Sequence, residues 1–248
     1  MPKGRKREMK AKSKIKFIFD VDGTLTPSRM PIDKDFGVWF ESFAKSHDVY
    51  LVTGSDRPKT LEQIGENIYN SCKRVYNCNG NDVWEKDVNV RSNDWVLPED
   101  AHEWLSIQLT ESDFKIRTGL HFEHRPGMVN FSVVGRNANK EQRSEYVTYD
   151  TLTSERATIA RQFNTLFPSI RATVGGETGI DISPLFTDKA QIIKDFGPQD
   201  KTYFFGDRMD EDGNDYPLAQ VVSASRSVIN WSQTKEYLEY FKELGIAL

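Results

Sequence analysis

The chain has 248 residues, a formal net charge of −4 and a pI near 5.7. That length can bury a hydrophobic core in one large domain or two small ones, and the acidic balance argues against general nucleic-acid binding. Residues 1–16 differ because they carry eight Lys or Arg against one Glu. Charge blocks of this kind are usually disordered, so we predict a basic flexible tail, with a nucleic-acid or membrane-surface role as the minor alternative.

Membrane and secretion signals are missing from the sequence. No apolar stretch is long enough to cross a bilayer, and the N-terminus lacks the apolar core and cleavage site of a signal peptide. Cys72 and Cys78 form neither a disulfide framework nor a zinc pattern. We therefore expect a cytoplasmic protein without a membrane partner, in which the sequons at Asn130 and Asn230 are chance occurrences.

Strands and helices alternate in the first third of the chain. Short apolar runs predict buried parallel strands, and stripes at helical spacing predict helices between them. In chain order these elements are residues 16–19, 33–46, 49–52, 57–71 and 74–80. The first helix places Phe36, Phe40 and Phe43 on one face with Asp33 or Asp35 as its N-cap, and the second carries Leu61, Ile64 and Ile68. This βαβαβ order favours a doubly wound parallel sheet.

The middle of the chain is richer in strands. A helix at 98–109 precedes strands at 114–125 and 128–136, and strands at 170–176 and 179–184 follow. Alternation in the second strand separates an apolar face (Val129, Phe131, Val133) from a polar one (Asn130, Ser132, Arg136), as in an antiparallel sheet covered on one side. A helix at 154–167, capped by Ser154, is the predicted cover.

The last third returns to an α/β pattern. It predicts a short helix at 188–197, strands at 201–207 and 221–225, and a terminal helix at 232–245 with Gly245 at its C′ position. We therefore predict an α+β cap, residues 87–186, inserted into an α/β core formed by residues 17–86 and 187–248.

Polar residues follow several predicted strands at one edge of the sheet. Asp20, Thr53 and Asp207 end strands, Ser55 follows Thr53 closely, and Lys189 begins a helix. Ligands of open α/β sheets bind at the carboxyl ends of the strands. Carboxylates suit Mg²⁺, while a lysine and a hydroxyl suit phosphate oxygens. This set predicts a site for phosphoryl transfer.

Asp20 and Asp22 form the centre of that predicted site. Their i, i+2 spacing places them on one side of an extended chain, about 6 to 7 Å apart. One carboxylate can attack phosphorus while the other moves a proton, and Gly23 permits the turn. A solvated turn with spare acids is the alternative, but it would not explain the lysine and acids at the other strand ends.

The acidic stretch "GDRMDEDGND", residues 206–215, resembles a calcium loop only superficially. Aligning Gly213 with the loop glycine puts Arg208 at the first ligand position and Ala219 at the position of the bidentate Glu. We interpret Asp207 as a magnesium ligand and Asp215 as a ligand or supporting carboxylate. Asp210, Glu211 and Asp212 are alternatively a solvated acidic loop.

The motifs "FDVDGTLTP", the hydroxyl after the second strand, the lysine and "GD…ND" resemble the four motifs of the haloacid dehalogenase superfamily. More narrowly, "FDVDGTLTPSR", "FEHRPGMVNFSVVGR" and "GGETGIDISP" are similar to the eukaryotic-type phosphomannomutases, from about Phe17 almost to the C-terminus. The resemblance implies a haloacid-dehalogenase-like core with a cap. It also implies interconversion of mannose 6-phosphate and mannose 1-phosphate, which supplies GDP-mannose synthesis.

The same resemblance implies roles for individual residues. Asp20 is the nucleophile, Asp22 is the acid/base, and Asp20, the backbone of Asp22 and Asp207 hold Mg²⁺. Hexose 1,6-bisphosphate is the implied activator, and a homodimer through the cap is the implied assembly. The implied sugar-phosphate contacts are Arg29, Arg125, Arg136, Arg143, the position of Gly179, and Asp181. Arginine forks suit a non-reacting phosphate, whereas a lone exposed arginine is more often only solvated.

The sequence departs from the family pattern at two positions, and two other functions compete with the mutase interpretation. The family has serine where this chain has Gly179 and glutamine where it has Glu177, which removes a hydroxyl and adds a negative charge near an anionic ligand. A sugar phosphatase would share the aspartyl phosphate but needs no second phosphate site. A non-catalytic binder would not need the Asp20, Asp22, Lys189 and Asp207 set. His121 and His124, at i, i+3 on a strand, are predicted to be structural.

Overall fold

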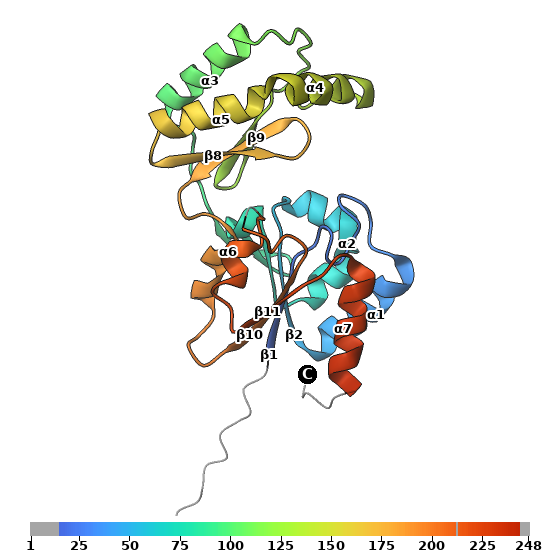
Figure 1. The fold of residues 1–248 in the computed structure, drawn as a ribbon. Coiled ribbons are helices and arrows are strands. Elements are labelled where there is room, and N and C mark those ends of the chain that lie inside the picture. The colour runs from blue at the N-terminus through green and yellow to red at the C-terminus, as the bar shows by residue number, and fades with distance from the viewer. Residues whose placement is uncertain (1–14, 212, 244–248) are drawn as a thin grey trace, which may run out of the picture.

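Two separate sheets organise the part of the chain that the structure, a computed structural model, describes: residues 15–211 and 213–243. Figure 1 shows the smaller sheet with its helices as a cap above the larger, core sheet. None of the helices in these ranges is long and apolar enough to cross a membrane.

The core sheet has seven strands in the order β11-β10-β1-β2-β3-β4-β5. The first five of these pair in parallel, and β4 and β5 add an antiparallel hairpin. The strands are β1 Ile15–Phe19, β2 Asp48–Val52, β3 Arg74–Asn77, β4 Asp82–Glu85, β5 Val88–Ser92, β10 Lys201–Gly206 and β11 Ala224–Ser227. The predicted parallel α/β sheet is therefore confirmed. β5 belongs to this sheet, although the sequence places residues 88–92 in the inserted unit.

Helices cover both faces of the core sheet. They are α1 Lys34–Ser46, α2 Arg57–Ser71, α6 Tyr216–Ala219 and α7 Trp231–Glu243, with 3-10 turns η1 Cys78–Gly80 and η2 Lys189–Asp195. The predicted stripe of α1 is confirmed, because Phe36, Phe40 and Phe43 pack in the core. Asp33 is its cap and accepts hydrogen bonds from the N–H groups of Asp35 and Phe36.

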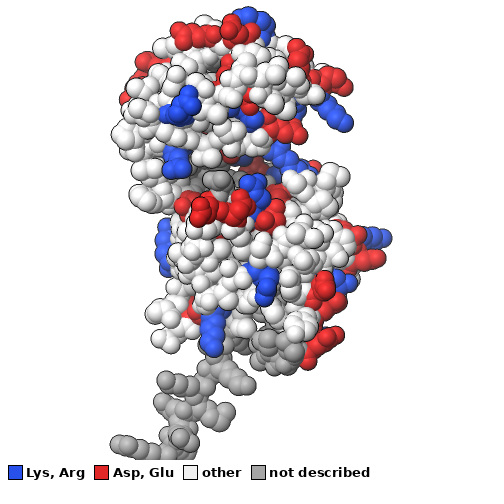
Figure 2. Space-filling view, in the orientation of Figure 1, with Lys and Arg blue, Asp and Glu red and all other residues white. Residues whose placement is uncertain are grey.

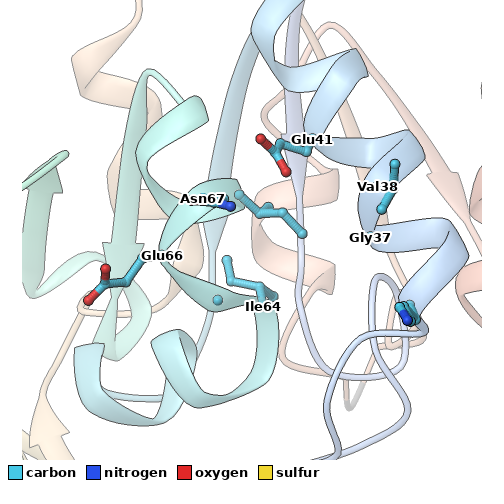
Figure 3. A pocket seen from close by; sticks show the side chains of 9 residues that line it. Gly37, Val38, Glu41, Ile64, Glu66 and Asn67 are labelled. Carbon is cyan, nitrogen blue, oxygen red and sulfur yellow. The ribbon is translucent and has the colours of Figure 1, made fainter.

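Helix α2 is interrupted at Gly65, whose φ of 75° and ψ of 158° are not helical. A shallow hollow lies beside this break, lined by one side of α1 and by residues 64–68 of α2 (Figure 3). The hollow contains none of the predicted site residues. The break at Gly65 ends the first part of α2 two residues after Gln63.

The cap is a four-stranded antiparallel sheet in the order β6-β7-β9-β8. Its three helices lie on the side away from the core, so the other face of the sheet is turned toward the core (Figure 1). The elements are α3 Glu99–Glu111, β6 Phe122–Arg125, β7 Met128–Phe131, α4 Lys140–Thr153, α5 Glu155–Leu166, β8 Ile170–Gly175 and β9 Gly179–Pro184. Val129, Phe131 and Val133 lie in the cap core, as the alternation predicts.

Several predicted element bounds are wrong. The strands predicted at 114–125 and 128–136 are regular only at β6 and β7. Gly119 and Gly135, both with positive φ, bend the intervening segments, which keep isolated backbone hydrogen bonds such as Arg136 to Leu120. Helix α4 was not predicted from the sequence. Ser154 does not cap α5 with its side chain; it has φ 55° and ends α4. β11 begins three residues later than predicted.

Candidate active site

Asp20 and Asp207 are neighbours because their strands pair in parallel. β1 and β10 place Phe19 opposite Phe205, and the N–H of Asp20 donates to the carbonyl of Phe205 at 2.9 Å. Gly23, with φ 76°, brings the loop after β1 against Asp207, since a Cβ on Gly23 would lie 2.3 Å from Oδ2 of Asp207. Any larger residue would displace the loop or the carboxylate.

Lys189 joins two of the predicted acids. Its side chain is 1% exposed, and its Nζ donates to Oδ1 of Asp20 at 2.6 Å and to Oδ1 of Asp215 at 2.7 Å. Burial disfavours the ammonium ion, but the two carboxylates outweigh this and raise the pKa of Lys189 above its usual value. The lysine is therefore a fixed positive charge beside Asp20.

Three acids surround this single lysine. Carboxylate oxygens of Asp20, Asp207 and Asp215 lie within 4.8 Å of one another, and no other group of potential metal ligands occurs in the described residues. Burial raises the pKa of Asp20 well above its usual value, although Lys189 opposes this, and burial together with Asp215 raises the pKa of Asp207. An added cation would relieve this excess of negative charge. The oxygen donors fit Mg²⁺.

Asp215 already uses both of its oxygens within the protein. Oδ1 accepts from Lys189 and Oδ2 accepts from the N–H of Arg208 at 3.1 Å. Of the two predicted roles for Asp215, these contacts favour a carboxylate that supports the site over a direct ligand of Mg²⁺. The carboxylate of Asp22 lies outside the three-acid group, and a metal contact through the backbone of Asp22 stays a prediction.

The Asp22 side chain accepts two hydrogen bonds, both on the same carboxylate oxygen. Its Oδ1 accepts from the N–H of Arg29 at 2.6 Å and from Nε2 of Gln63 at 2.9 Å. Thr53 directly follows β2 and is buried, and its Oγ1 accepts from the N–H of Ser55 at 3.1 Å. The structure thus brings both predicted hydroxyls to the carboxyl end of β2, next to β1. Their contact with phosphate stays a prediction.

Glu123 gathers two of the predicted arginines in the cap. Nε and Nη2 of Arg125 donate to it at 3.3 and 3.0 Å, and Nε of Arg136 lies 2.5 Å from its Oε2. Burial disfavours the carboxylate, but the two guanidinium groups outweigh this and lower the pKa of Glu123. The three side chains form one unit with a net positive charge.

Glu177 holds the third cap arginine. Nε and Nη2 of Arg143, in α4, donate to its Oε2 at 3.1 and 2.8 Å. Arg29 comes from the core loop after β1, yet it also reaches this turn, because a Cβ on Gly176 would lie 3.0 Å from its Nη2. Hydrogen bonding and charge from Arg143, with a smaller effect of Arg29, lower the pKa of Glu177. Arg143 from the cap is therefore hydrogen-bonded to this carboxylate, while Arg29 from the core adds positive charge beside the same turn.

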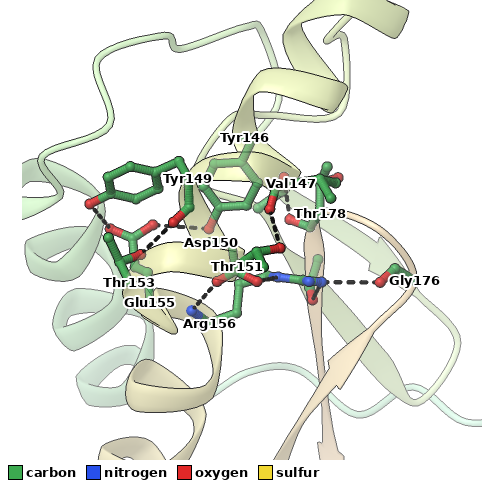
Figure 4. Close-up of polar contacts among 12 residues, drawn as sticks. Tyr146, Val147, Tyr149, Asp150, Thr151, Thr153, Glu155, Arg156, Gly176 and Thr178 are labelled. Carbon is green, nitrogen blue, oxygen red and sulfur yellow. Dashed lines mark hydrogen bonds and ion pairs between the residues drawn. The ribbon is translucent and has the colours of Figure 1, made fainter.

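The turn that carries Glu177 is supported from behind by Arg156 (Figure 4). Nη1 of Arg156 donates to the carbonyls of Gly176 and Gly179 at 3.1 and 3.3 Å, while its Nε donates to Asp150 at 2.8 Å. Next to this turn, Nδ2 of Asn130 donates to Oδ1 of Asp181 at 2.6 Å. A Cβ on Gly179 would lie 2.5 Å from that Nδ2, so a serine at Gly179 does not fit beside Asn130 as placed.

Charged side chains of both signs meet at the waist between cap and core (Figure 2). The tip of the β6–β7 hairpin closes one side of the waist, since the N–H of Gly127 donates to the carbonyl of Asn93 at 2.9 Å. His121 is a structural residue as predicted: its Nδ1 lies 2.8 Å from the carbonyl oxygen of Ser132.

Sequence reasoning missed Gln63, Glu123 and Arg156. Each contacts a predicted site residue or its loop, but nothing near Gln63 or Arg156 in the chain marks either of them. "FEHR" places Glu123 two positions before Arg125, and this i, i+2 spacing on a strand was the one available signal, since both side chains then point to the same face.

The architecture is that of capped haloacid-dehalogenase-like proteins. An IMP-nucleotidase from Plasmodium falciparum matches with a TM-score of 0.61 at 16% identity, covering 94% of this chain and 69% of that one. A haloacid dehalogenase-like hydrolase from Bacteroides thetaiotaomicron matches with a TM-score of 0.56 at 15% identity, covering 90% and 92%. At these identities the likeness establishes the fold alone.

Sequence comparison defines the family. The model of the eukaryotic phosphomannomutase family matches residues 38–242. The phosphomannomutase of Spinacia oleracea is 32% identical, covering 85% of this chain and 88% of that protein. Phosphomannomutase 1 of Dictyostelium discoideum is 30% identical, covering 89% and 94%. The chain belongs to the eukaryotic phosphomannomutase family, enzymes of intramolecular phosphate transfer for which a divalent metal is implied.

Proposed function

We propose that the chain is a phosphomannomutase that interconverts mannose 6-phosphate and mannose 1-phosphate. The observation that carries this proposal is the pairing of a buried nucleophile with a second anion site. Oδ1 of Asp20 accepts a hydrogen bond from Nζ of Lys189 at 2.6 Å. The cap carries Arg125 and Arg136 paired with Glu123, and Arg143 paired with Glu177. A mutase needs both parts because its intermediate carries two phosphates.

Asp20 acts as the nucleophile in this mechanism. Its carboxylate oxygen attacks phosphorus of a hexose 1,6-bisphosphate, the bond from phosphorus to the sugar oxygen breaks, and Asp22 gives that oxygen a proton. A sugar monophosphate takes the phosphoryl group from Asp20 on its free hydroxyl, which gives its proton to Asp22. The bisphosphate so formed turns end over end, and its other phosphoryl group then passes to Asp20 in the same way, which releases the isomeric monophosphate. Lys189 holds Asp20 in place and offsets its charge. Bound Mg²⁺, held by Asp20, Asp207 and the backbone of Asp22, would neutralise charge on the transferring phosphoryl group.

The cap holds the phosphate that does not react. Guanidinium forks bind phosphate oxygens bidentately, and Glu123 keeps Arg125 and Arg136 oriented together. Asp181, whose Oδ1 accepts from Asn130, would accept a hydrogen bond from a sugar hydroxyl. Closure of the cap on the core would exclude water from the aspartyl phosphate.

A coupled assay of mannose 1-phosphate and glucose 1-phosphate conversion, with hexose 1,6-bisphosphate present, tests the proposal and ranks the two hexoses. We expect isomer conversion that depends on Mg²⁺ and is stimulated by the bisphosphate. Rapid net release of phosphate with no isomer conversion would refute the mutase assignment.

Sugar-phosphate hydrolysis is the second candidate function. It is favoured by Glu177, whose carboxylate already occupies Arg143, and by Gly179, which lacks a hydroxyl for the distal phosphate. Both features weaken a second anion site. The ratio of phosphate release to isomer conversion in the same assay separates the two functions.

We further propose a cytoplasmic homodimer that pairs through the cap, as the family resemblance implies. Light scattering of the full chain, compared with a variant carrying charged substitutions on the exposed cap helices, would measure the assembly. A monomeric wild type would contradict it.

A further inference from the structure

Gln63 is a buried side chain whose contacts lead directly to the predicted acid/base. It is 1% exposed and lies in α2, two residues before the break at Gly65. Its Nε2 donates to Oδ1 of Asp22 at 2.9 Å and to Oγ1 of Thr26 at 3.1 Å. Both N–H groups of the amide therefore serve the loop that follows β1.

The carbonyl end of the same amide has no partner. Oε1 of Gln63 is buried without a hydrogen bond among the residues that the structure describes. Buried amide oxygens are normally hydrogen-bonded, and leaving one unpaired is unfavourable. The opposite orientation would place Oε1 against Oδ1 of Asp22, two acceptors facing each other. The two hydrogen bonds from Nε2 therefore set the orientation of the amide, and they leave Oε1 without a hydrogen bond.

A second donor reaches the same oxygen of Asp22. The N–H of Arg29 donates to Oδ1 at 2.6 Å, and Arg29 has φ 58°, a left-handed backbone that a non-glycine residue rarely adopts. Within residues 15–211 and 213–243, Oδ2 of Asp22 accepts no hydrogen bond. The two oxygens of this carboxylate are therefore unequal: Oδ1 is held, and Oδ2 is left for another partner.

We propose that Gln63 is a positioning residue for proton transfer. Together with the backbone of Arg29, it fixes Oδ1 of Asp22 so that Oδ2 carries the proton to and from the sugar oxygen. This inference rests on the proposed chemistry of Asp20 and Asp22. In the step concerned, Asp20 forms its bond to phosphorus, the phosphorus bond to the sugar oxygen breaks, and the proton moves from Oδ2 to that oxygen.

The dependence on the leaving group tests this role. A sugar oxygen needs a proton to leave, whereas 4-nitrophenolate leaves as an anion, so only the first reaction needs a well-placed Oδ2. Gln63→Met keeps a similar length but removes both donors. We expect phosphoenzyme formation from glucose 1,6-bisphosphate to slow by about 10- to 100-fold in this variant, part of the full effect of a general acid. The first-turnover burst of 4-nitrophenolate from 4-nitrophenyl phosphate should stay within about threefold of wild type, since that reaction does not need the acid.

Thr26→Val is the matched control, because it removes the other partner of the Gln63 amide and leaves the contact to Asp22. The rates of Thr26→Val with glucose 1,6-bisphosphate and with 4-nitrophenyl phosphate should both stay close to those of the wild type. An equal loss with both phosphoryl donors in Gln63→Met, or no loss with either, would overturn the proposal. A structural defect would slow both reactions and lower the thermal midpoint. A phosphatase would show the same leaving-group contrast, so failure of the mutase assay would not be mistaken for failure of this inference.

Discussion

Nζ of Lys189 lies 2.6 Å from Oδ1 of Asp20, and both side chains are buried. The lysine comes from η2, 169 positions away in the chain from the aspartate. Among residues 15–211 and 213–243, Lys189 is the one cation that is hydrogen-bonded to any of the three acids, so it has to stay charged and in place for the site to form.

Replacing Lys189 with Met should destabilise the fold and stop the chemistry. Breaking a buried ion pair leaves uncompensated charge, at a cost of about 3 to 5 kcal/mol. We expect the urea midpoint to fall and the yield of phosphoenzyme to drop below detection. Lys194→Met, an exposed lysine in the same turn, is the control. Wild-type stability in Lys189→Met would contradict the buried pair.

Asp20→Asn should separate activity from stability. Burial raises the pKa of Asp20 because the folded site disfavours its negative charge, so the amide should leave the metal-free protein as stable as the wild type or raise its thermal midpoint. A gain of 1 kcal/mol would correspond to about 2 to 4 °C for a chain of this size. Phosphoenzyme should be absent. Mg²⁺ should raise the midpoint of the wild type more than that of the variant.

Asp210→Asn serves as the comparison for that experiment, because Asp210 is an exposed acid in the loop after β10. It should keep both activity and the response to Mg²⁺. An unchanged response to Mg²⁺ in Asp20→Asn would argue against a metal at this aspartate.

Glu177→Gln should improve binding of sugar phosphate only modestly. The variant frees Arg143 from a carboxylate, but Glu177 is 66% exposed, and exposed pairs contribute about 0.2 to 1 kcal/mol. We therefore expect KM to fall by about 1.5- to 5-fold with kcat little changed. Initial rates over a range of substrate concentrations measure this, with Glu141→Gln on α4 as control. A higher KM would show that Glu177 assists binding instead.

Gly179→Ser restores the family residue but should not restore its function alone. The new Cβ would meet Nδ2 of Asn130 at 2.5 Å, so Asn130 must move and its hydrogen bond to Asp181 would weaken. Overpacking of this kind costs about 1 to 3 kcal/mol. The double variant with Asn130→Ala should be less destabilised than the sum of the two single variants. If denaturant unfolding showed that the losses of unfolding free energy in the two single variants simply add in the double variant, the proposed clash would be ruled out.

Glu123 should make the free energy of unfolding depend on pH, because its stabilising contribution is lost at low pH. Its pKa is lowered in the folded state, so its contribution is present above its ordinary pKa of 4.5 and is lost as the pH falls through the folded value. Wild type should be more stable than Glu123→Gln at pH 7, and the difference should shrink below pH 4.5. Unfolding curves at several pH values measure it. A constant difference would mean that the charge of Glu123 contributes nothing.

Local patterns were enough to predict much of this molecule. The apolar runs and helical stripes predicted the parallel core strands and α1, because burial on both faces of a sheet or on one face of a helix leaves a period in the sequence. Element ends were less accurate. At Gly119, Gly135 and Ser154, positive backbone angles interrupt patterns that continue in the side chains.

The candidate site was also predictable only in part. By itself, the sequence determined that Asp20, Thr53 and Asp207 follow strands of one sheet, and parallel pairing then requires their side chains to share an edge. Which partners hold them was decided only by the tertiary structure. Gln63 reaches Asp22 across 41 positions, and Lys189 reaches Asp20 across 169. Such contacts depend on how α2 breaks and how η2 packs, and neither leaves a periodic signal in the chain.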